Sequence, residues 1–313
     1  MEKSSKIYIA GHRGMAGSAI RRRLEAAGYD NFIDRNHNDL DLTDQAATHA
    51  FFEAEHPHIV VLAAARVGGI LANATYPADF ILDNLKIQTN VIEAAWRTGT
   101  IKLMFLGSAC IYPKLASQPM AEEALLTGPL EPTNEAYAVA KIAGIALCDA
   151  LRHQHGFNTV SIMPNNLYGP GDNFHLENAH VLPALIRKFH QAKENGDAHV
   201  VVWGTGTPLR EFLHVDDFAA AAVFMLQEYD QGGLINVGTG TDISIGDVAA
   251  LIKDVVGFEG DIVFDQTKPD GVPKKLLDCT KLHDLGWRSS ISLAAGLKST
   301  YDWFLANQDS FRR

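Results

Sequence analysis

Short, nearly continuous apolar runs alternate with longer amphipathic stretches through the first half of the chain. Such runs are typical of parallel strands buried on both faces, and a helical repeat of apolar positions predicts helices. Strands are predicted at residues 6–10, 31–34, 58–65, 102–107 and 159–164, and helices at 18–27, 45–55, 77–98 and around 133–141. This alternation predicts a Rossmann-like α/β fold with a doubly wound parallel sheet and right-handed crossovers.

The pattern loosens after residue 171, where we predict the start of a second, smaller α/β lobe. Strands are predicted at residues 200–203 and 234–237, and helices at 181–195, 218–227 and 245–256. We expect residues 1–171 and about 212–257 to form a dinucleotide-binding domain. The smaller lobe, about 172–211 plus 258–313, is expected to bind the substrate, with the site between the two parts.

Three glycines between the first predicted strand and helix predict a dinucleotide site. Gly11 permits the tight turn, Gly14 lets the backbone approach a pyrophosphate, and Gly17 allows the helix to pack closely on the strand. The amide groups at the start of the helix are then available to the phosphates. The predicted cofactor loop consists of Gly11, His12, Arg13, Gly14, Met15, Ala16 and Gly17.

Residues near the second predicted strand bear on the choice of cofactor. Arg13 in the glycine loop and Arg35 after the strand are cations placed for a 2′-phosphate, which favours NADP(H). Asp34 is an acidic residue that could bind the ribose hydroxyls of NAD, so NAD stays open. Asp41 and Leu42 are expected to border the adenine.

Tyr137 and Lys141 stand four residues apart, so they share one face of a predicted helix. A lysine ammonium near a phenol favours the phenolate, so we expect Lys141 to lower the pKa of Tyr137 toward neutral pH. The same spacing also fits an amphipathic helix with a half-buried tyrosine and a surface lysine. Ser108 and Cys110 follow the predicted strand at 102–107, at the end where α/β sheets place ligands.

Composition argues against several classes of function. The net charge of −10 disfavours a nucleic acid or an anionic membrane as partner. Cys110, Cys148 and Cys279 form no CxxC pair, so neither a disulfide framework nor a metal site is predicted. No apolar run is long enough to span a bilayer, and residues 1–9 lead directly into a predicted strand without the apolar h-region expected of a signal peptide. We expect a cytoplasmic protein that acts on a small molecule.

Motifs along the whole chain resemble those of the extended short-chain dehydrogenase/reductase superfamily, and within it the GDP-L-fucose synthase family. The set Ser108, Tyr137 and Lys141 with the glycine loop is the first of them. Further matching stretches are residues 67–70 (VGGI), 107–113 (GSACIYP), 165–170 (NNLYGP), 203–206 (WGTG) and 268–271 (KPDG). The resemblance implies NADPH-dependent conversion of GDP-4-keto-6-deoxy-D-mannose to GDP-L-fucose, by epimerisation at carbons 3 and 5 and reduction of the 4-keto group.

The residues make chemical sense of that reaction. A 4-keto group acidifies the hydrogens on both neighbouring ring carbons, so one base and one acid can invert both centres. Cys110 is close enough to Ser108 to be the base, if nearby positive charge favours its thiolate. The resemblance implies that His180 is the acid. Ser108 and Tyr137 would bind the 4-keto oxygen, Tyr137 would donate the proton in the reduction, and Lys141 would hold the nicotinamide ribose.

The resemblance implies further ligand contacts. Cofactor contacts are expected at Leu106, Gly107, Tyr137, Lys141, Pro164, Asn165, Asn166, Leu167 and His180. Contacts with the GDP-sugar are expected at Lys188, Trp203, Arg210 and Asp270. Arg210 suits the diphosphate because a guanidinium binds phosphate oxygens in pairs. For Trp203, a place in the hydrophobic core fits as well as a ligand contact.

The chain departs from the family pattern at three positions. Lys188 stands at a position where arginine is frequent in the family. Lysine keeps the positive charge but lacks the planar guanidinium group that can donate two hydrogen bonds side by side. His37 lies near the position where family members are expected to have a second cofactor-binding arginine. Ala109 stands at a position where serine is frequent in the family. The resemblance also implies a homodimer that pairs through helices including the one that carries Tyr137.

Three other functions are considered. A nucleotide-sugar 4,6-dehydratase needs an Asp-Glu pair after the catalytic Ser or Thr, and Ala109 and Cys110 stand there instead. Another nucleotide-sugar 4-epimerase or reductase would not need Cys110 and His180 as a base–acid pair, and it remains the enzymatic alternative. A non-catalytic NADP-binding sensor could share the fold, although such proteins typically lose the Tyr or Lys that is present here.

Overall fold

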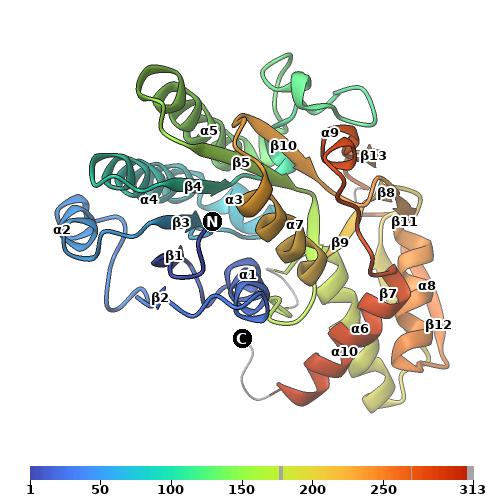
Figure 1. Cartoon of the computed structure of the whole chain (residues 1–313). Helices are drawn as coiled ribbons and strands as arrows, with labels where there is room; N and C mark the ends of the chain where they lie inside the picture. The colour runs from blue at the N-terminus through green and yellow to red at the C-terminus, as the bar shows by residue number, and fades with distance from the viewer. Residues whose placement is uncertain (176–178, 269, 309–313) are drawn as a thin grey trace.

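The computed structural model describes residues 1–175, 179–268 and 270–308, and a six-stranded parallel sheet forms its centre (Figure 1). The strand order is β10-β5-β4-β3-β1-β2. The strands are β1 Ile7–Ala10, β2 Phe32–Ile33, β3 Ile59–Leu62, β4 Lys102–Leu106, β5 Thr159–Pro164 and β10 Leu234–Val237. The predicted doubly wound α/β fold is confirmed, with β10 from the later chain added beside β5.

Helices cover both faces of the sheet, because successive side chains of each strand point to opposite faces. Ile7 and Ile9 of β1 pack in one core with α1 and α7, whereas Tyr8 and Ala10 pack in another with α2, α4 and α5. These helices are α1 Met15–Ala26, α2 Gln45–Glu55, α4 Pro77–Arg97, α5 Glu135–His155 and α7 Val215–Glu228. The predicted helices are confirmed, although α1 and α7 begin before the expected residues 18 and 218.

Several short elements connect the strands on the side where the predicted site lies. Helix α3, Ile70–Thr75, follows residues 66–69 directly and was not predicted. Three 3-10 turns are η1 Ala109–Ile111, η2 Glu122–Ala124 and η3 Pro132–Asn134. The turn η1 matters most for the site, because it leads the chain from the end of β4 past Ser108 and Cys110.

The smaller lobe combines short paired strands with three helices. β6 Asn166–Tyr168 pairs parallel with β9 Phe212–His214, and β7 His199–Trp203 pairs parallel with β12 Asp261–Asp265. β8 Leu209–Arg210 lies between β11 Ile243–Ser244 and β13 Lys274–Lys275. The helices that pack here are α6 Val181–Asn195, α8 Ile245–Val256 and α10 Leu293–Ala306. A further helix, α9 Thr280–Asp284, contacts β10 of the large sheet.

The expected division of the chain into two lobes stays a prediction. Strand β10 and helix α7, both within residues 212–257, belong to the large sheet and its helical cover. Helix α8, within the same range, packs against α6 and α10 of the smaller lobe. None of the described helices is long and apolar enough to cross a membrane.

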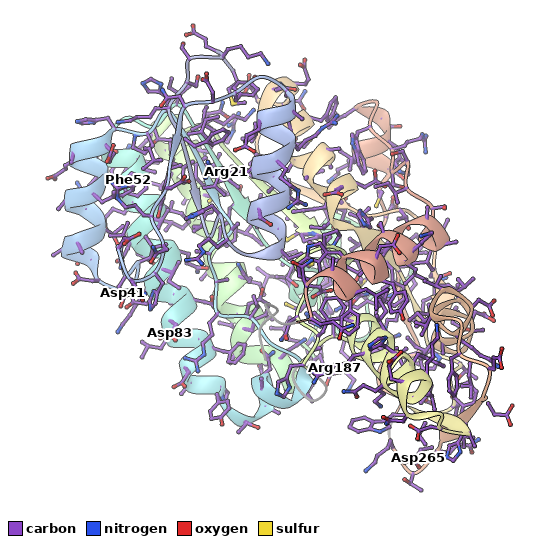
Figure 2. All side chains as sticks on the ribbon, turned by 90° about the horizontal axis from the view of Figure 1, so that it is seen from below. Arg21, Asp41, Phe52, Asp83, Arg187 and Asp265 are labelled. Atoms are coloured by element: carbon purple, nitrogen blue, oxygen red, sulfur yellow. The ribbon has the colours of Figure 1, made fainter. Side chains whose placement is uncertain are left out.

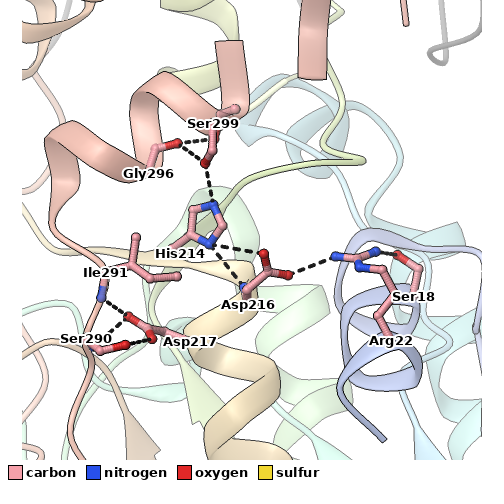
Figure 3. A network of polar contacts seen from close by, with 10 residues as sticks. Ser18, Arg22, His214, Asp216, Asp217, Ser290, Ile291, Gly296 and Ser299 are labelled. Carbon is pink, nitrogen blue, oxygen red and sulfur yellow. Dashed lines mark hydrogen bonds and ion pairs between the residues drawn. The ribbon is translucent and has the colours of Figure 1, made fainter. Parts of the chain in front are cut away.

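A polar network at the start of α7 joins the two parts (Figure 3). The His214 ring accepts a hydrogen bond from the Asp216 amide at its Nδ1 (3.2 Å), and its Nε2 lies 3.2 Å from Ser299 Oγ on α10. Asp216 also forms an ion pair with Arg22 of α1 at 2.9 Å. The buried Asp217 carboxylate accepts hydrogen bonds from residues 290 and 291. Helices α1, α7 and α10 are therefore held in one arrangement.

Lys102 holds the other end of α7. Its side chain is buried at the start of β4, and its Nζ donates to the carbonyl oxygens of Met225 and Leu226, both at 2.9 Å. The same nitrogen reaches the Tyr229 carbonyl at 2.5 Å and the Asp230 carboxylate at 3.1 Å. Carbonyl groups in the last turn of a helix lack partners within the helix, so this buried cation satisfies them.

Replacing Lys102 with methionine removes the lysine donor from the carbonyl oxygens of Leu226 and Tyr229, whereas the Met225 oxygen keeps the Tyr229 amide at 3.3 Å. We expect Lys102→Met to lower the free energy of unfolding by about 2–4 kcal/mol, measured by urea denaturation. Lys298→Met is the control, because Lys298 is exposed and, within the described part of the chain, its one ion pair is with Asp302 one turn away on α10. That change is expected to cost under about 0.5 kcal/mol, and equal losses in the two variants would contradict the capping role.

Candidate active site

The loop between β1 and α1 has the shape that a dinucleotide pyrophosphate requires. Gly11 has φ +87°, a left-handed backbone that glycine adopts without strain, and it accepts a hydrogen bond from the Gly14 amide at 2.9 Å. A Cβ at Gly17 would overlap the carbonyl oxygen of Gly11, so only glycine lets α1 approach this closely. Among the described residues no side chain caps the start of α1, so its first amides can bind phosphate oxygens.

The end of β4 brings together four of the five candidate catalytic residues. Ser108 begins η1, and its Oγ accepts a hydrogen bond from the Cys110 amide at 3.4 Å. On α5, the Lys141 Nζ lies 5.7 Å from the centre of the Tyr137 ring. The same Nζ donates to the Leu106 carbonyl oxygen at 2.8 Å, which ties α5 to the end of β4. An acid, a base and a hydroxyl donor thus face the same small region.

Burial dominates the acid–base properties of this cluster. It raises the pKa of the Tyr137 phenol, with Cys110 adding to the rise and the Ser108 hydroxyl opposing it. Burial also lowers the pKa of Lys141 to about 8, although Cys110 opposes that shift. The expectation that Lys141 lowers the pKa of Tyr137 is therefore wrong, because the loss of solvation on burial is the largest influence on the phenol and raises its pKa. Tyr137 keeps its proton at neutral pH and can act as an acid.

Lys275 on β13 links Cys110 to the fifth candidate, His180. Burial raises the pKa of the Cys110 thiol, and the charge of Lys275 is the largest influence opposing that rise. His180 immediately precedes α6, and desolvation of its ring lowers its pKa, with the charge of Lys275 lowering it further. Among the described residues no group of His, Cys, Asp and Glu side chains could hold a metal ion. Cys110 and His180 are both influenced by the charge of Lys275, and both remain candidates for proton transfer.

Lys275 and Asn134 are two site residues that sequence reasoning missed. Lys275 lies in a two-residue strand far along the chain from Cys110, so no local pattern points to it. Asn134 immediately precedes α5, and its Oδ1 is buried with no hydrogen-bond partner among the described residues. A buried acceptor this close to Tyr137 is available to a ligand. The sequence could have pointed to Asn134, because an asparagine just before a helix usually caps it with its side chain. Here the Asn134 side chain makes no such capping hydrogen bond.

The candidate residues for the adenosine end are already engaged with one another. Arg35 forms an ion pair with Glu55 at 2.7 Å, and Asp34 forms one with Arg21 of α1. Asp41 accepts hydrogen bonds from the amide and hydroxyl of the nearby residue 43, which lower its pKa. Figure 2 shows Arg21 and Asp41 in the large lobe and Arg187 and Asp265 in the smaller one. A 2′-phosphate bound by Arg35 would have to share that side chain with Glu55. Arg13 is exposed in the glycine loop and is the other arginine predicted to bind the phosphate.

The four expected GDP-sugar contacts form two neighbouring pairs in the smaller lobe. Lys188 Nζ lies 5.3 Å from the centre of the Trp203 ring, which is 64% exposed, so Trp203 is no core residue. Asp270 accepts a hydrogen bond from the Thr205 hydroxyl at 2.8 Å, just beyond Trp203. Burial lowers the pKa of Arg210, and the charge of Asp270 opposes that shift. Pro269 of the same motif lies outside the described residues.

The ends of β4 and β5 carry the remaining cofactor candidates. The Gly107 amide donates to the Ile162 carbonyl oxygen at 3.0 Å, and a Cβ at Gly107 would overlap the side chain of Met163. Asn165 and Asn166 follow β5 directly, and both side-chain amides donate to Glu211, at 2.8 Å each. The expected contacts at Leu106, Pro164 and Leu167 lie on the same two strand ends and on β6.

Comparisons with known proteins agree with this geometry. Residues 7–238 match the model of the NAD dependent epimerase/dehydratase family. The GDP-L-fucose synthase 1 of Arabidopsis thaliana is 60% identical over 306 residues, which cover 98% of this chain and 95% of that protein. The GDP-L-fucose synthase of Escherichia coli strain K12 is 57% identical over 316 aligned residues, which cover 98% of each chain.

A solved structure extends the agreement to three dimensions. The GDP-L-fucose synthetase of Naegleria fowleri, described as bound to NADP, superposes with a TM-score of 0.92 at 31% sequence identity. The alignment covers 100% of this chain and 98% of that one. The sequence match, the shared fold and the assembled Ser108, Tyr137 and Lys141 cluster lead to one conclusion. This chain belongs to the NAD dependent epimerase/dehydratase family, in its extended short-chain dehydrogenase/reductase branch.

Proposed function

We propose that the protein converts GDP-4-keto-6-deoxy-D-mannose to GDP-L-fucose, by epimerisation at carbons 3 and 5 and NADPH-dependent reduction at carbon 4. The observation that carries the proposal is the identity of 57–60% with GDP-L-fucose synthases over nearly the full length of the chain. The proximity of Ser108, Cys110 and Tyr137 at the end of β4 supports the proposal.

NADP(H) fits the residues present. A Cβ at Gly11 would overlap the backbone of Ala64 and a Cβ at Gly17 would overlap the Gly11 carbonyl oxygen, so glycine keeps this loop tight, and the uncapped start of α1 offers amides to the pyrophosphate. Bound NADPH supplies the hydride that reduces carbon 4. Lys141 directs its ammonium toward the end of β4, where it can hold ribose hydroxyls while it donates to Leu106. Arg13 is the exposed cation nearest the pyrophosphate loop and is our candidate for the 2′-phosphate.

Epimerisation needs a base, an acid and a site that stabilises the enolate. Cys110 is the proposed base: its thiolate removes a proton from a carbon beside the ketone, and Lys275 and Lys141 favour the charged sulfur. Negative charge then develops on the 4-oxygen, where Ser108 and Tyr137 can donate hydrogen bonds. His180 returns a proton to the opposite face of the ring, which inverts the centre.

Reduction uses the same oxygen-binding pair. The raised pKa of Tyr137 keeps the phenol protonated at neutral pH, so it can donate its proton to the 4-oxygen as carbon 4 is reduced. Ser108 holds that oxygen in place throughout. Lys188, Trp203, Arg210 and Asp270 are proposed to bind the GDP part, which leaves the sugar at the end of β4.

We further propose that the protein works in the cytoplasm as a homodimer. Leu82 of α4 and Val139 of α5 are 52% and 40% exposed on two helices that pack side by side. Apolar side chains exposed on neighbouring helices fit a symmetric contact with a second copy. Light scattering that gives the mass of one chain at micromolar concentration would contradict the dimer.

The direct test of the proposed function is NADPH oxidation by the purified protein with GDP-4-keto-6-deoxy-D-mannose. We expect one NADPH consumed per molecule of substrate and GDP-L-fucose as the product identified by NMR. Oxidation that yields a sugar without inversion would leave a reductase and remove the roles of Cys110 and His180. No oxidation would point to another nucleotide sugar or to a non-catalytic sensor.

Tyr137→Phe removes the proposed proton donor and leaves the ring in place. We expect kcat for NADPH oxidation to fall by about 10²–10⁴-fold, while the Kd for NADPH, measured by fluorescence, changes by less than about threefold. Tyr301→Phe is the matched control, because its hydroxyl contacts His190 in the smaller lobe instead. Turnover at the wild-type rate in Tyr137→Phe would place the proton donor elsewhere.

Cys110→Ser replaces the proposed base with a much weaker acid. We expect the exchange of solvent deuterium into carbons 3 and 5 of the sugar to fall by at least about a hundredfold. Because burial raises the pKa of the Cys110 thiol, wild-type exchange should increase as the pH rises from 7 to 9 and thiolate forms. Cys148→Ser, buried on α5, should leave exchange unaffected. Unchanged exchange in Cys110→Ser would exclude Cys110 as the base.

A further inference from the structure

Glu211 is a fully buried carboxylate between β8 and β9 that the mechanism above does not use. Its Oε1 accepts hydrogen bonds from the amides of Thr239 at 2.7 Å and Gly240 at 2.8 Å. Its Oε2 accepts from the amide of Leu277 at 3.0 Å and from the side chain of Asn165 at 2.8 Å. Both oxygens therefore receive two strong donors.

The hydrogen-bond pattern supplies donors to both oxygens of the Glu211 side chain. All four groups are N–H donors, and the Thr239 hydroxyl adds a longer hydrogen bond to Oε1 at 3.3 Å. Among the residues that the structure describes, no ion pair includes Glu211. The buried carboxyl is therefore satisfied by hydrogen bonds from surrounding segments, and losing one of these donors leaves a buried polar oxygen without a partner.

The donors come from three segments that surround the proposed site. Asn165 follows β5, Thr239 and Gly240 follow β10, and Leu277 follows β13. The Asn165 side chain also donates to the carbonyl oxygen of Lys275 at 3.3 Å. In the parallel pairing of β13 with β8, Lys275 stands opposite Arg210, the neighbour of Glu211. One carboxylate thus fixes the strand that carries Lys275 against the strand that carries Arg210.

We propose that Glu211 is a positioning residue that aligns β8 with β13, so that Arg210 and Lys275 are placed together for the GDP-sugar. The inference rests on the proposed function for the identity of the ligand. Among the described hydrogen bonds of the Glu211 side chain, one comes from a cofactor candidate, Asn165, and none comes from the glycine loop between β1 and α1, so we expect NADPH binding to depend less on this carboxylate than binding of the GDP-sugar does.

The primary test is Glu211→Gln, which keeps the size of the side chain and replaces one acceptor oxygen with an NH₂ group. That group must face backbone or amide donors, so one of the two pairs of hydrogen bonds is lost. We expect the KM for GDP-4-keto-6-deoxy-D-mannose, and the Kd for GDP measured by calorimetry, to rise about tenfold or more. The Kd for NADPH should stay within about threefold of the wild type.

Asp217→Asn is a matched control. Asp217 is 4% exposed and likewise accepts from backbone amides, those of Ser290 and Ile291 at 2.9 and 2.8 Å, on the far side of α7 (Figure 3). We expect it to lower the Tm by an amount similar to Glu211→Gln while the Kd for GDP stays within about twofold. Should Glu211→Gln fail to fold, Glu211→Asp keeps the charge, shortens the reach and is read by the same two constants.

The outcomes separate this inference from the proposed function. A lower Tm with an unchanged Kd for GDP would make Glu211 purely structural and overturn the inference. Equal increases in the Kd for GDP and for NADPH would also overturn it, because they indicate general damage. A wild-type protein that binds no GDP would instead contradict the proposed function.

Discussion

Parallel pairing of β1, β4, β5 and β10 places the carboxyl ends of all four strands on one edge of the sheet. The glycine loop leaves the sheet after β1, the Ser108 turn after β4, and the two asparagines after β5. Because these segments share one edge, residues that are far apart in the sequence meet without long loops. The smaller lobe completes the edge, and the Glu211 carboxylate joins it to the ends of β5 and β10.

Loss of solvation is the second constraint, and it changes how the site can work. Burial moves the pKa of Tyr137 upward and that of Lys141 downward, so both side chains are pushed toward their neutral forms. The protonated phenol of Tyr137 can therefore donate a proton.

Cys110 has the opposite requirement, because its thiol must lose a proton and become charged before it can act as a base. The site meets that need with the positive charge of Lys275, which the chain brings in from β13.

The sequence predicts the large sheet well, because its strands and helices carry long, clear hydrophobic patterns. The smaller lobe was predicted less completely: β8 and β13 contain two residues each, too few for a pattern, and they pair across some 65 residues. Lys275 was missed for the same reason. The pKa of Tyr137 was misjudged because sequence shows the neighbouring charge of Lys141 but not the burial of both side chains, which outweighs it.

The central claim is that one oxygen-binding pair, Ser108 and Tyr137, serves two epimerisations and one reduction at the same sugar. The most direct measurement is the NMR spectrum of the product formed by the wild-type protein in D₂O with unlabelled NADPH. The account predicts GDP-L-fucose with deuterium at carbons 3 and 5 and hydrogen at carbon 4. Hydrogen retained at carbon 3 or 5, or deuterium at carbon 4, would contradict it.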